Sequence, residues 1–537
     1  MEYKKYKAIL FDTRSIQRYI FSGNRLKTNI GASYLVDRVF DDVLLPAVRK
    51  VLGADGLDAD TWRDNPEPRW DEMETAARVG YIGGGNALLI LRAETTEETM
   101  RAIVTAFTEQ LLVRTPGLRT GAAMGDLELG ADGSYGGKDL TALVHALKEW
   151  QNTVFPCVNL PYTGLTLDCR ESGETANAWD ESEQRFYSWE VEMKLCADRR
   201  REKEAPAEEE LRQKLLSEQQ TDFMEGYAFP MEFSELGQKT PKNDIAVVHI
   251  DGNNMGLKFQ ACTTLTLRKN LSREIRKKTI AAFNALIEEI ILYIEVGVYD
   301  NELLVLHDEE GRRLLPIRPL VLGGDDMTFV CPAKVAVTYA RSIMKELKEK
   351  HGIASCAGIT IMNTNDPFFR GYQMAEELCG AAKQRMREYA EEQRVRECPA
   401  ESDTESCWLD FAILHGEQAS SLAQFRAQEY LGACGEMHFG PYRVDADAAD
   451  EKSIDALLAG VRGMRDLPRN KVKELRRVLA YREHEQRQFM AQLCYLDMRL
   501  PDVPAWSTYE DDLWAAGRTP YIDAIELMDY IIVDEEV

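Results

Sequence analysis

The stretch PLVLGGDDMTFVC (319–331) decides the fold prediction. Two apolar runs flank the quartet Gly323, Gly324, Asp325 and Asp326. Glycine adopts positive φ angles at little cost, and a short Gly/Asp segment between apolar runs is typical of a tight turn joining two antiparallel strands. The stretch therefore predicts a β-hairpin whose turn presents two adjacent carboxylates.

The sequence on both sides of this hairpin supplies the remaining elements of a small sheet. Upstream, IAVVHIDGNNMG (245–256) is a β-branched run that stops at Asp251, and apolar residues then recur at helical spacing over 268–295. Downstream, the pattern predicts a helix over 333–350, a strand over 355–362 and a further helix over 369–383. The order βαββαβ is that of a ferredoxin-like sheet.

The same order occurs near the N-terminus, so the chain is predicted to be internally duplicated. Its parts are a strand at 7–12, helical residues up to position 51, the hairpin GYIGGGNALLIL (80–91), a helix over 95–112 and a strand at 118–125. In this copy the hairpin reads Gly83, Gly84, Gly85, Asn86. Both positions that match Asp325 and Asp326 lack a carboxylate, so this copy is expected to fold alike without holding metals alike.

The fold class predicted from these patterns is α+β, with two ferredoxin-like domains of which the second carries GGDD. A charge-rich stretch at 198–220 is interpreted as exposed helix or linker, and the pattern after the second copy is mainly helical. The predicted boundaries are a degenerate first domain at 1–150, a linker or helical insert at 151–240, the second, catalytic domain at 241–390 and a C-terminal α-helical domain at 391–537.

The acidic residues of the second copy suggest phosphoryl or nucleotidyl transfer. Asp251, at the end of one strand, is expected to face the hairpin acids of the neighbouring strand, and converging carboxylates supply the hard oxygen ligands that two divalent cations require. Glycines in both loops leave room for phosphates. GGDD alone is also compatible with an ordinary polar turn, and the helix and IDGNN motif upstream make the metal interpretation the stronger one.

Composition limits the other classes of function. A formal net charge of −25 disfavours independent binding of nucleic acid, although the basic stretches at 268–278 and 465–478 are either solvated helix faces or docking faces. The sequence contains no apolar run long enough to span a membrane and no recognisable signal peptide, so a cytoplasmic location is expected. Eleven cysteines without a CxxC pair argue against a disulfide framework, and Cys157 with Cys169 would supply only half a zinc site.

Several motifs in this order resemble the large, palm-containing subunit of type III CRISPR effector complexes, which makes cyclic oligoadenylates from ATP. The matching motifs are FDTRSIQRYIFSGNRLKTNIGASYLVDRV (11–39), the GGGN hairpin, IDGNNMG with LGGDDMTF, AEELCGAAKQ (375–384), GPYRVDADAADEKSIDALL (440–458) and LPRNKVKELRRVL (467–479). In that family the second palm is catalytic, the first is its inactive partner, and ATP lies between them.

The resemblance implies roles for individual residues. It casts Asp251, Asp325 and Asp326 as the catalytic residues that bind two Mg²⁺ or Mn²⁺ ions, with ATP as substrate. It places the nucleotide against Gly252, Asn253, Gly323 and Gly324, with Lys383 on the triphosphate and with Ser33, in the segment 17–33, beside the second nucleotide pocket. The implied partners are the other protein subunits of the complex and, through them, guide RNA and target RNA.

Two departures from the family pattern concern an HD nuclease domain and a cysteine-rich zinc motif, and of the latter only the remnant around Cys157 and Cys169 is present. The sequence starts at its first palm, so an HD nuclease domain is not expected, and the dipeptide His307, Asp308 lies in a polar loop without further histidines at suitable spacing. Product identity stays open: a cyclic dinucleotide, or AMP joined to another acceptor, needs the same palm chemistry. A scaffold without catalysis is the remaining alternative, and the intact Asp251 and GGDD argue against it.

Overall fold

The computed structural model of the chain groups into two compact units. The first comprises Met1–Asp222, Asn254–Ile280 and Leu320–Asp325, and the second comprises Phe223–Asn253, Ala281–Pro319 and Asp326–Val537. Within them the structure describes residues 3–153, 164–181, 183–198, 206–217, 219, 222–239, 243–396, 405–416 and 421–532. No helix in these ranges combines the length and the apolar character that a membrane crossing requires.

The first unit is built on a five-stranded sheet of order β2-β3-β4-β1-β5. Its strands are β1 (Lys4–Arg14), β2 (Leu57–Asp58), β3 (Ala77–Gly83), β4 (Asn86–Arg92) and β5 (Arg119–Leu129). Its helices are α1 (Ile16–Phe21), α2 (Leu26–Val39), α3 (Leu45–Leu52), α4 (Thr61–Asp64), α5 (Glu97–Arg114) and α6 (Leu140–Thr153). The long strands and helices therefore follow the order βαββαβ along the chain.

Alternation along β1 shows why this sheet is covered on both faces. Leu10 belongs to a core cluster that includes Leu143 of α6, so the even-numbered residues face α6. Phe11 points the other way and contacts Phe107 of α5 with ring centroids 5.2 Å apart. A strand buried on both faces has a nearly continuous apolar sequence, as KAILF at 7–11 does.

The remaining elements of the first unit lie around this sheet. They are β6 (Ala178–Asp180), β7 (Arg185–Tyr187), α7 (Trp189–Asp198), α8 (Pro206–Leu216) and α9 (Met255–Gln260). The interpretation of 198–220 as exposed helix or linker was wrong for one face of α8. Leu215 is fully buried, and the ammonium group of Lys214 lies 3.4 Å from the carboxylate of Asp37 on α2, because the helix packs against its own unit through that side.

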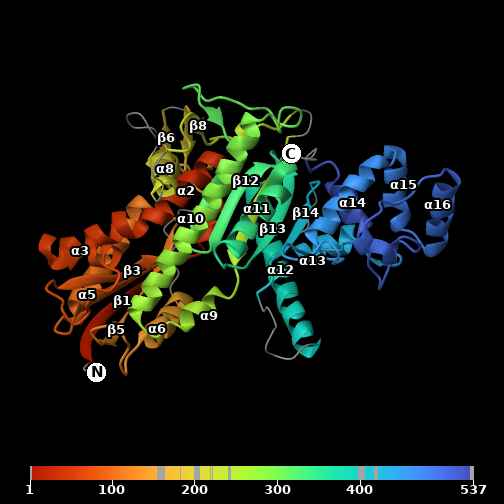
Figure 1. Cartoon of the computed structure of the whole chain (residues 1–537). Helices are drawn as coiled ribbons and strands as arrows, with labels where there is room; N and C mark the ends of the chain where they lie inside the picture. Colours follow the sequence, from red (N-terminus) through yellow and green to blue (C-terminus); the bar gives the residue numbers. More distant parts are fainter. Residues whose placement is uncertain are drawn as a thin grey trace. The chain divides into compact units, whose positions relative to one another are not determined.

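The larger sheet has the order β11-β12-β9-β13-β14-β17 (Figure 1), and all of its strands except most of β11 belong to the second unit. Its strands are β9 (Asp244–Gly252), β11 (Arg318–Gly323), β12 (Asp326–Pro332), β13 (Ser355–Asn363), β14 (Trp408–Ile413) and β17 (Tyr442–Arg443). The long helices are α10 (Leu265–Glu295), which begins in the first unit, α11 (Ala336–Glu349) and α12 (Phe368–Arg396). β12 and β13 both pair with β9 in antiparallel register.

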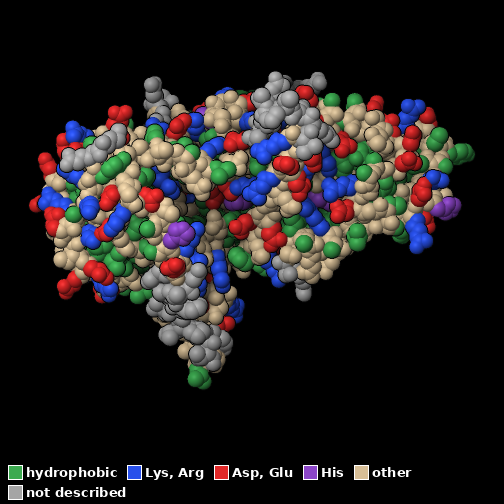
Figure 2. Space-filling view, turned by 90° about the horizontal axis from the view of Figure 1, so that it is seen from below, with side chains coloured by type: hydrophobic (Ala, Val, Ile, Leu, Met, Phe, Trp, Pro, Cys, Tyr) green, Lys and Arg blue, Asp and Glu red, His purple; other side chains and the backbone are tan. Residues whose placement is uncertain are grey.

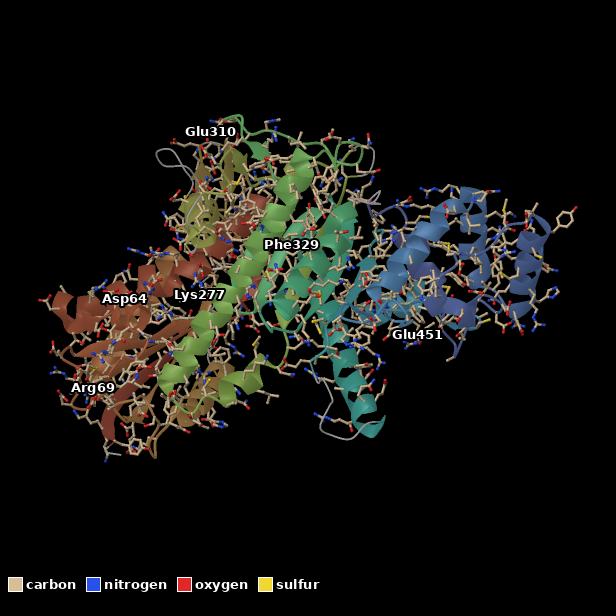
Figure 3. The ribbon with its side chains drawn as sticks, viewed as in Figure 1. Asp64, Arg69, Lys277, Glu310, Phe329 and Glu451 are labelled. Atoms are coloured by element: carbon tan, nitrogen blue, oxygen red, sulfur yellow. The ribbon has the colours of Figure 1, made fainter. Side chains whose placement is uncertain are left out.

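Two aromatic contacts identify the helix on each face of this sheet. Phe329 of β12, labelled in Figure 3, lies 6.3 Å from Phe283 of α10 between ring centroids, and its cross-strand partner is Val248. His249, the next residue of β9, points to the opposite face and contacts Tyr372 of α12 with ring centroids 5.7 Å apart. Asp251 shares the face of His249 because side chains alternate along a strand, so the acidic strand end lies on the α12 side.

The segment after residue 390 contains more than the predicted helices. α12 continues to Arg396, and β14 then pairs in parallel with β13, which extends the sheet of the second domain. Figure 1 shows α12 running past the end of this sheet. The strand was missed because WLDFAI (408–413) is a short run that is buried throughout and shows no alternation of polar and apolar residues.

Four helices form most of the C-terminal region: α14 (Ile454–Asp466), α15 (Arg469–Leu479), α16 (Glu483–Tyr495) and α17 (Tyr521–Leu527). Short elements complete the unit, namely β8 (Tyr227–Ala228), β10 (Arg313–Leu314), α13 (Leu422–Glu429), β15 (Leu431–Gly432) and β16 (Gly435–Glu436). The face in Figure 2 shows Lys and Arg side chains interspersed with Asp and Glu side chains.

The basic stretch at 465–478 is partly used inside the chain. Arg465 donates to the carbonyl oxygen of Met528, Arg469 pairs with Asp529 at 2.6 Å, and Arg476 pairs with Glu526 at 3.0 Å. These contacts fasten α17 and the residues after it to α14 and α15. The stretch is therefore not simply a solvated face, and its use as a docking face stays a prediction that rests on its other cations.

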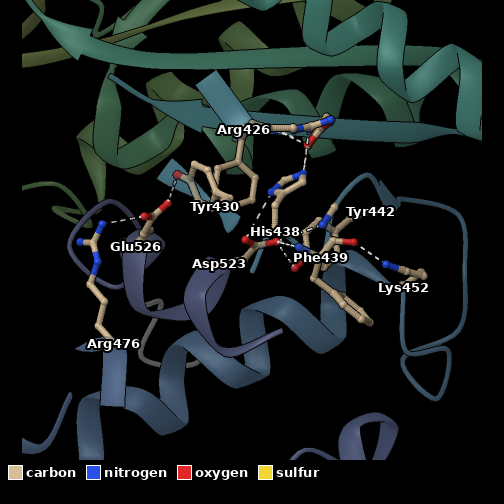
Figure 4. Close-up of polar contacts among 12 residues, drawn as sticks. Arg426, Tyr430, His438, Phe439, Tyr442, Lys452, Arg476, Asp523 and Glu526 are labelled. Carbon is tan, nitrogen blue, oxygen red and sulfur yellow. Dashed lines mark hydrogen bonds and ion pairs between the residues drawn. The ribbon is translucent and has the colours of Figure 1, made fainter. Parts of the chain in front are cut away.

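A buried network of charges joins the sheet to the C-terminal helices (Figure 4). His438 lies between two carboxylates, with Nε2 3.1 Å from Asp410 and Nδ1 3.4 Å from Asp523. Burial alone would lower the pKa of His438, but Asp523 and Asp410 reverse this and raise it to about 9. Asp410 also pairs with Arg426. The imidazolium thus links β14 to α17.

The raised pKa of His438 predicts how stability changes with pH. Because the pKa of a free histidine is about 6.5, the stabilisation should be complete below pH 6.5 and be lost as the pH rises through about 9. We expect Tm to fall across this window, and to fall less in His438→Gln, which has no charge to lose. Calorimetry at pH 6.5 and 9 measures both, and equal pH slopes for the two proteins would contradict the assignment.

Candidate active site

The two acidic segments of the second domain are placed together by strand register. Asp326, the first residue of β12, lies directly opposite Asp251 near the end of β9, and Thr328 lies opposite His249. Cβ atoms of directly opposed residues in antiparallel strands are about 4.5 to 5.5 Å apart. Both carboxylates are partly exposed, at 34% for Asp251 and 23% for Asp326. The register therefore converges two accessible carboxylates on one face of the sheet.

The hairpin turn is open on its outer side. Gly324 has a φ of 63°, which glycine adopts readily, and added Cβ atoms at Gly323 and Gly324 would meet nothing within 4 Å. The hydroxyl of Thr279 on α10 donates to the carbonyl oxygen of Gly324 at 2.7 Å and so fixes the turn. Asp325 occupies the remaining position of this turn, beside Asp326 in the chain. Such a turn leaves space for a bulky ligand beside the acids.

Lys383 brings a cation to the same place. It lies on α12, and its ammonium group donates to the Asp251 carboxylate and, at 3.4 Å, to the carbonyl oxygen of Gly252. Burial alone would lower the pKa of Lys383, but Asp251 reverses this and raises it. The lysine therefore neutralises one of the proposed metal ligands, and its contact with a triphosphate stays a prediction.

Two residues of the predicted nucleotide site have structural contacts. Asn253 is almost completely buried, and its side-chain amide donates to the carbonyl oxygen of Ser406 at 3.1 Å. Ser33 on α2 donates its hydroxyl to the carbonyl oxygen of Leu320. Asn253 thus braces the turn after β9 and Ser33 braces β11. Direct contact of either side chain with a nucleotide stays a prediction.

Sequence reasoning missed the layer of residues behind the carboxylates. His249 is buried, and Tyr372 of α12 packs on its ring. Burial, followed by the charge of Asp326, raises the pKa of Tyr372 far above its ordinary value, which keeps the phenol neutral. Burial also lowers the pKa of His249, against the opposing effect of Asp251. The available signal was spacing, since His249 precedes Asp251 by two residues on one strand and must share its face.

The first-unit hairpin has the same register with different side chains. Asp12 of β1 lies opposite Asn86 of β4, as Asp251 lies opposite Asp326. Gly84 and Gly85 both have positive φ, and the Asn86 amide donates back to the Gly84 carbonyl oxygen at 3.0 Å. This copy keeps the acid at the strand end, which sequence comparison of the hairpins alone did not reveal. An amide replaces the hairpin acid.

The cysteines and the His–Asp dipeptide, which the sequence did not favour as metal sites, have other surroundings. Cys157 lies outside the described residues. Cys169 is buried, and although burial alone would raise its pKa, the N–H of Ser188 and the hydroxyl and N–H of Ser172 lower it. Asp308 accepts from the guanidinium of Arg312 at 2.8 Å. Over the described ranges, no group of three or more His, Cys, Asp and Glu side chains is already arranged around a common point as a metal site.

Comparison with protein families identifies the domain that carries the acids. Residues 244–390 match the model of the Cas10/Cmr2 second palm domain. This segment is similar to a Cas10/Cmr2 second palm. This match spans β9 through most of α12 and includes Asp251, Asp325, Asp326 and Lys383. The family resemblance of the sequence motifs is thereby confirmed for this domain.

The similarity of the chain to solved structures is low. The chain is similar to the structure titled as the Csm1–Csm4 cassette in complex with cA4, at 13% identity over 71% of this chain and 53% of that chain, with a TM-score of 0.42. The cassette in complex with cA3 is 14% identical over 71% of this chain and 53% of that chain, with a TM-score of 0.42. The apo cassette is 13% identical over the same shares of the two chains, with a TM-score of 0.43. The chain thus spans about half the length of those chains. No curated protein matched.

Proposed function

We propose that this chain is the large subunit of a type III CRISPR effector complex and joins ATP molecules into cyclic oligoadenylates by two-metal nucleotidyl transfer. The observation that carries the proposal is the register of Asp251 with Asp326 inside a domain that matches the Cas10/Cmr2 second palm. In this proposal both sheets are ferredoxin-like palms. The second is catalytic, and the first, with Asn86 at the hairpin position, is its inactive partner.

The residues at this face suit divalent cations. Asp251 and Asp326 offer hard carboxylate oxygens from opposed strand positions, Asp325 adds a third from the turn, and the ammonium of Lys383 already lies where positive charge is favoured. We infer that these three acids hold two Mg²⁺ or Mn²⁺ ions. When bound, such ions stabilise the charge on the attacking and leaving oxygens of a phosphoryl group.

The protein's own groups position the substrate. The open turn at Gly323 and Gly324 lets a triphosphate approach the backbone beside the acids, and Lys383 is placed to exchange its contact with Asp251 for one with a phosphate oxygen. The buried side chains of Tyr372 and His249 pack against each other behind the carboxylates, and this packing leaves little room for water there. A fixed frame of this kind lowers the cost of aligning a 3′-hydroxyl with the phosphorus atom that it attacks.

Lys383 provides a direct test of substrate binding. We expect Lys383→Met to raise KM for ATP by about tenfold to a hundredfold, because a hydrogen bond between charged groups contributes roughly 1.5 to 3 kcal/mol. Lys383→Arg should recover part of the loss. Initial rates at saturating Mg²⁺ measure KM and kcat separately. An unchanged KM in Lys383→Met would show that Lys383 does not contact the triphosphate.

Partners are also part of the proposal. The net charge of −25 disfavours independent capture of RNA, so we infer that other effector subunits bring guide RNA and target RNA. We also propose that the complex works in the cytoplasm. The similar solved chains are described as Csm1 with Csm4, in complex with ATP, cA3 or cA4. Docking of partners would favour the aligned arrangement of the catalytic groups by a shift in population.

The proposal is tested by product analysis. The purified chain, the complex with guide RNA, and the complex with guide and matching target RNA are each incubated with ATP or with GTP and Mg²⁺, and products are identified by mass spectrometry. We expect cyclic oligoadenylates only from ATP, with the highest yield in the target-bound complex. A cyclic dinucleotide or an AMP conjugate would replace the proposed product, equal yields in all three preparations would exclude RNA control, and no product in any of them would favour a scaffold.

A further inference from the structure

His249 stands directly behind the hairpin acid. It is 5% exposed and lies on β9, opposite Thr328 of β12 and diagonal to Asp326. Its Nδ1 atom is 3.1 Å from the hydroxyl oxygen of Thr328 and 3.4 Å from Oδ1 of Asp326. The ring of Tyr372 packs against the imidazole from α12. The imidazole therefore has little freedom to rotate, and one nitrogen is directed toward the hairpin.

The two oxygens of Asp326 have different surroundings. Oδ1, which faces His249, is buried, whereas the side chain as a whole remains 23% exposed. One oxygen is therefore turned into the protein and the carboxylate keeps access to the open face that it shares with Asp251. A carboxylate that binds a metal through its outer oxygen is commonly fixed by a hydrogen bond to its inner oxygen.

We propose that His249 is a positioning residue for Asp326: its Nδ1–H group donates to the inner carboxylate oxygen and thereby directs the outer oxygen toward a divalent cation. This proposal rests on the proposed function, because it assumes that Asp326 binds a metal. Thr328 is the second acceptor of the same N–H group and shares this donor with Asp326. Tyr372 packs on the other side of the imidazole and limits its movement.

Matched substitutions separate this role from simple packing. The side-chain amide nitrogen of asparagine occupies the place of histidine Nδ1, and that of glutamine reaches the place of Nε2. Both replacements are polar amides of the same type, so His249→Asn keeps a donor toward Asp326 and His249→Gln moves it away. Thr328→Val removes the competing acceptor and leaves the donor to Asp326 in place.

The experiment is a Mn²⁺ titration of the purified chain, followed by calorimetry or electron paramagnetic resonance, together with Tm for each variant. We expect His249→Gln to weaken Mn²⁺ binding by about tenfold to a hundredfold, the usual effect of losing such a partner. His249→Asn and Thr328→Val should stay within about threefold of the unsubstituted chain. In activity assays, His249→Gln should need more metal while KM for ATP at saturating metal is unchanged.

Each outcome decides a separate point. Equal Mn²⁺ affinity in His249→Gln and the unsubstituted chain would overturn the positioning role and leave the metal site intact. Equal weakening in His249→Asn and His249→Gln would assign the effect to packing and also overturn it. If the unsubstituted chain binds no Mn²⁺, the metal site itself is overturned. The proposed function and the role of His249 are then overturned with it.

Discussion

Asp326→Ala is expected to lower the rate of product formation from ATP by about a thousandfold or more. The substitution removes a hard ligand from the point where β12 meets Asp251, and the lost stabilisation applies to the transferring phosphoryl group rather than to the fold. Because the side chain is partly exposed and its loss relieves repulsion with Asp251, Tm should change by less than about 3 °C. Initial rates at saturating Mg²⁺ and calorimetry measure the two quantities.

The control for this prediction is Asp502→Ala, which removes an exposed carboxylate from the same unit, away from the hairpin. Its rate should equal that of the unsubstituted chain. Asp326→Asn keeps the shape and loses the charge, so it should be nearly as impaired as Asp326→Ala. Near-normal synthesis by Asp326→Ala in excess metal would contradict the two-metal assignment.

Asp523→Ala is expected to destabilise the second unit strongly. Asp523 is fully buried and accepts hydrogen bonds from the N–H groups of Phe439 and Gly440, both at 3.0 Å, and from the hydroxyl of Tyr442 at 2.7 Å. His438 lies beside its other oxygen. Removing one member of a buried charged pair costs roughly 3 to 5 kcal/mol, because the remaining donors lose their partner in a dry environment.

The expected fall in Tm is about 10 °C for a unit of this size. Asp511→Ala provides the control, since this carboxylate is exposed and lies in the same region of the chain. Differential scanning calorimetry at pH 7 measures both variants. A decrease below about 2 °C for Asp523→Ala would show that the network in Figure 4 contributes little to stability.

The strand and the hairpin that carry the candidate acids were predicted from the sequence because local patterns carry that information. A β-branched run that ends at Asp251 and a Gly/Asp quartet between two apolar runs determine a strand and a hairpin through neighbouring residues alone. The helix over 268–295 was predicted for the same reason and is observed as Leu265–Glu295. These elements depend on periodicity and turn chemistry, which a single sequence displays directly.

Contacts between distant residues were not predictable in this way. The burial of Asn253 depends on the carbonyl oxygen of Ser406, 153 residues later in the chain, and the pairing of Lys383 with Asp251 depends on where α12 crosses the sheet. β14 was missed for a related reason, because a fully buried strand loses the alternation that marks strands in sequence. The positions at which elements pack are set by the whole core rather than by their own residues.

The basic stretch at 465–478 shows the same limit for charge. In sequence its arginines suggest a surface for phosphates or for an acidic partner. In the structure, Arg469 and Arg476 pair with Asp529 and Glu526, which lie about 50 to 60 residues further along the chain. Part of this cluster of like charges therefore has its ionic partners within the same chain.

The central claim is that Asp251 and Asp326 hold divalent cations in the second palm and that Asp12 and Asn86 do not in the first. The most direct measurement is a crystal structure with Mn²⁺ and a non-hydrolysable ATP analogue, in which anomalous scattering locates the metal. The account predicts two Mn²⁺ peaks at the Asp251, Asp325 and Asp326 carboxylates, with the analogue's phosphates beside the Gly323 turn. Peaks at the Asp12 hairpin instead, or none at Asp326, would contradict it.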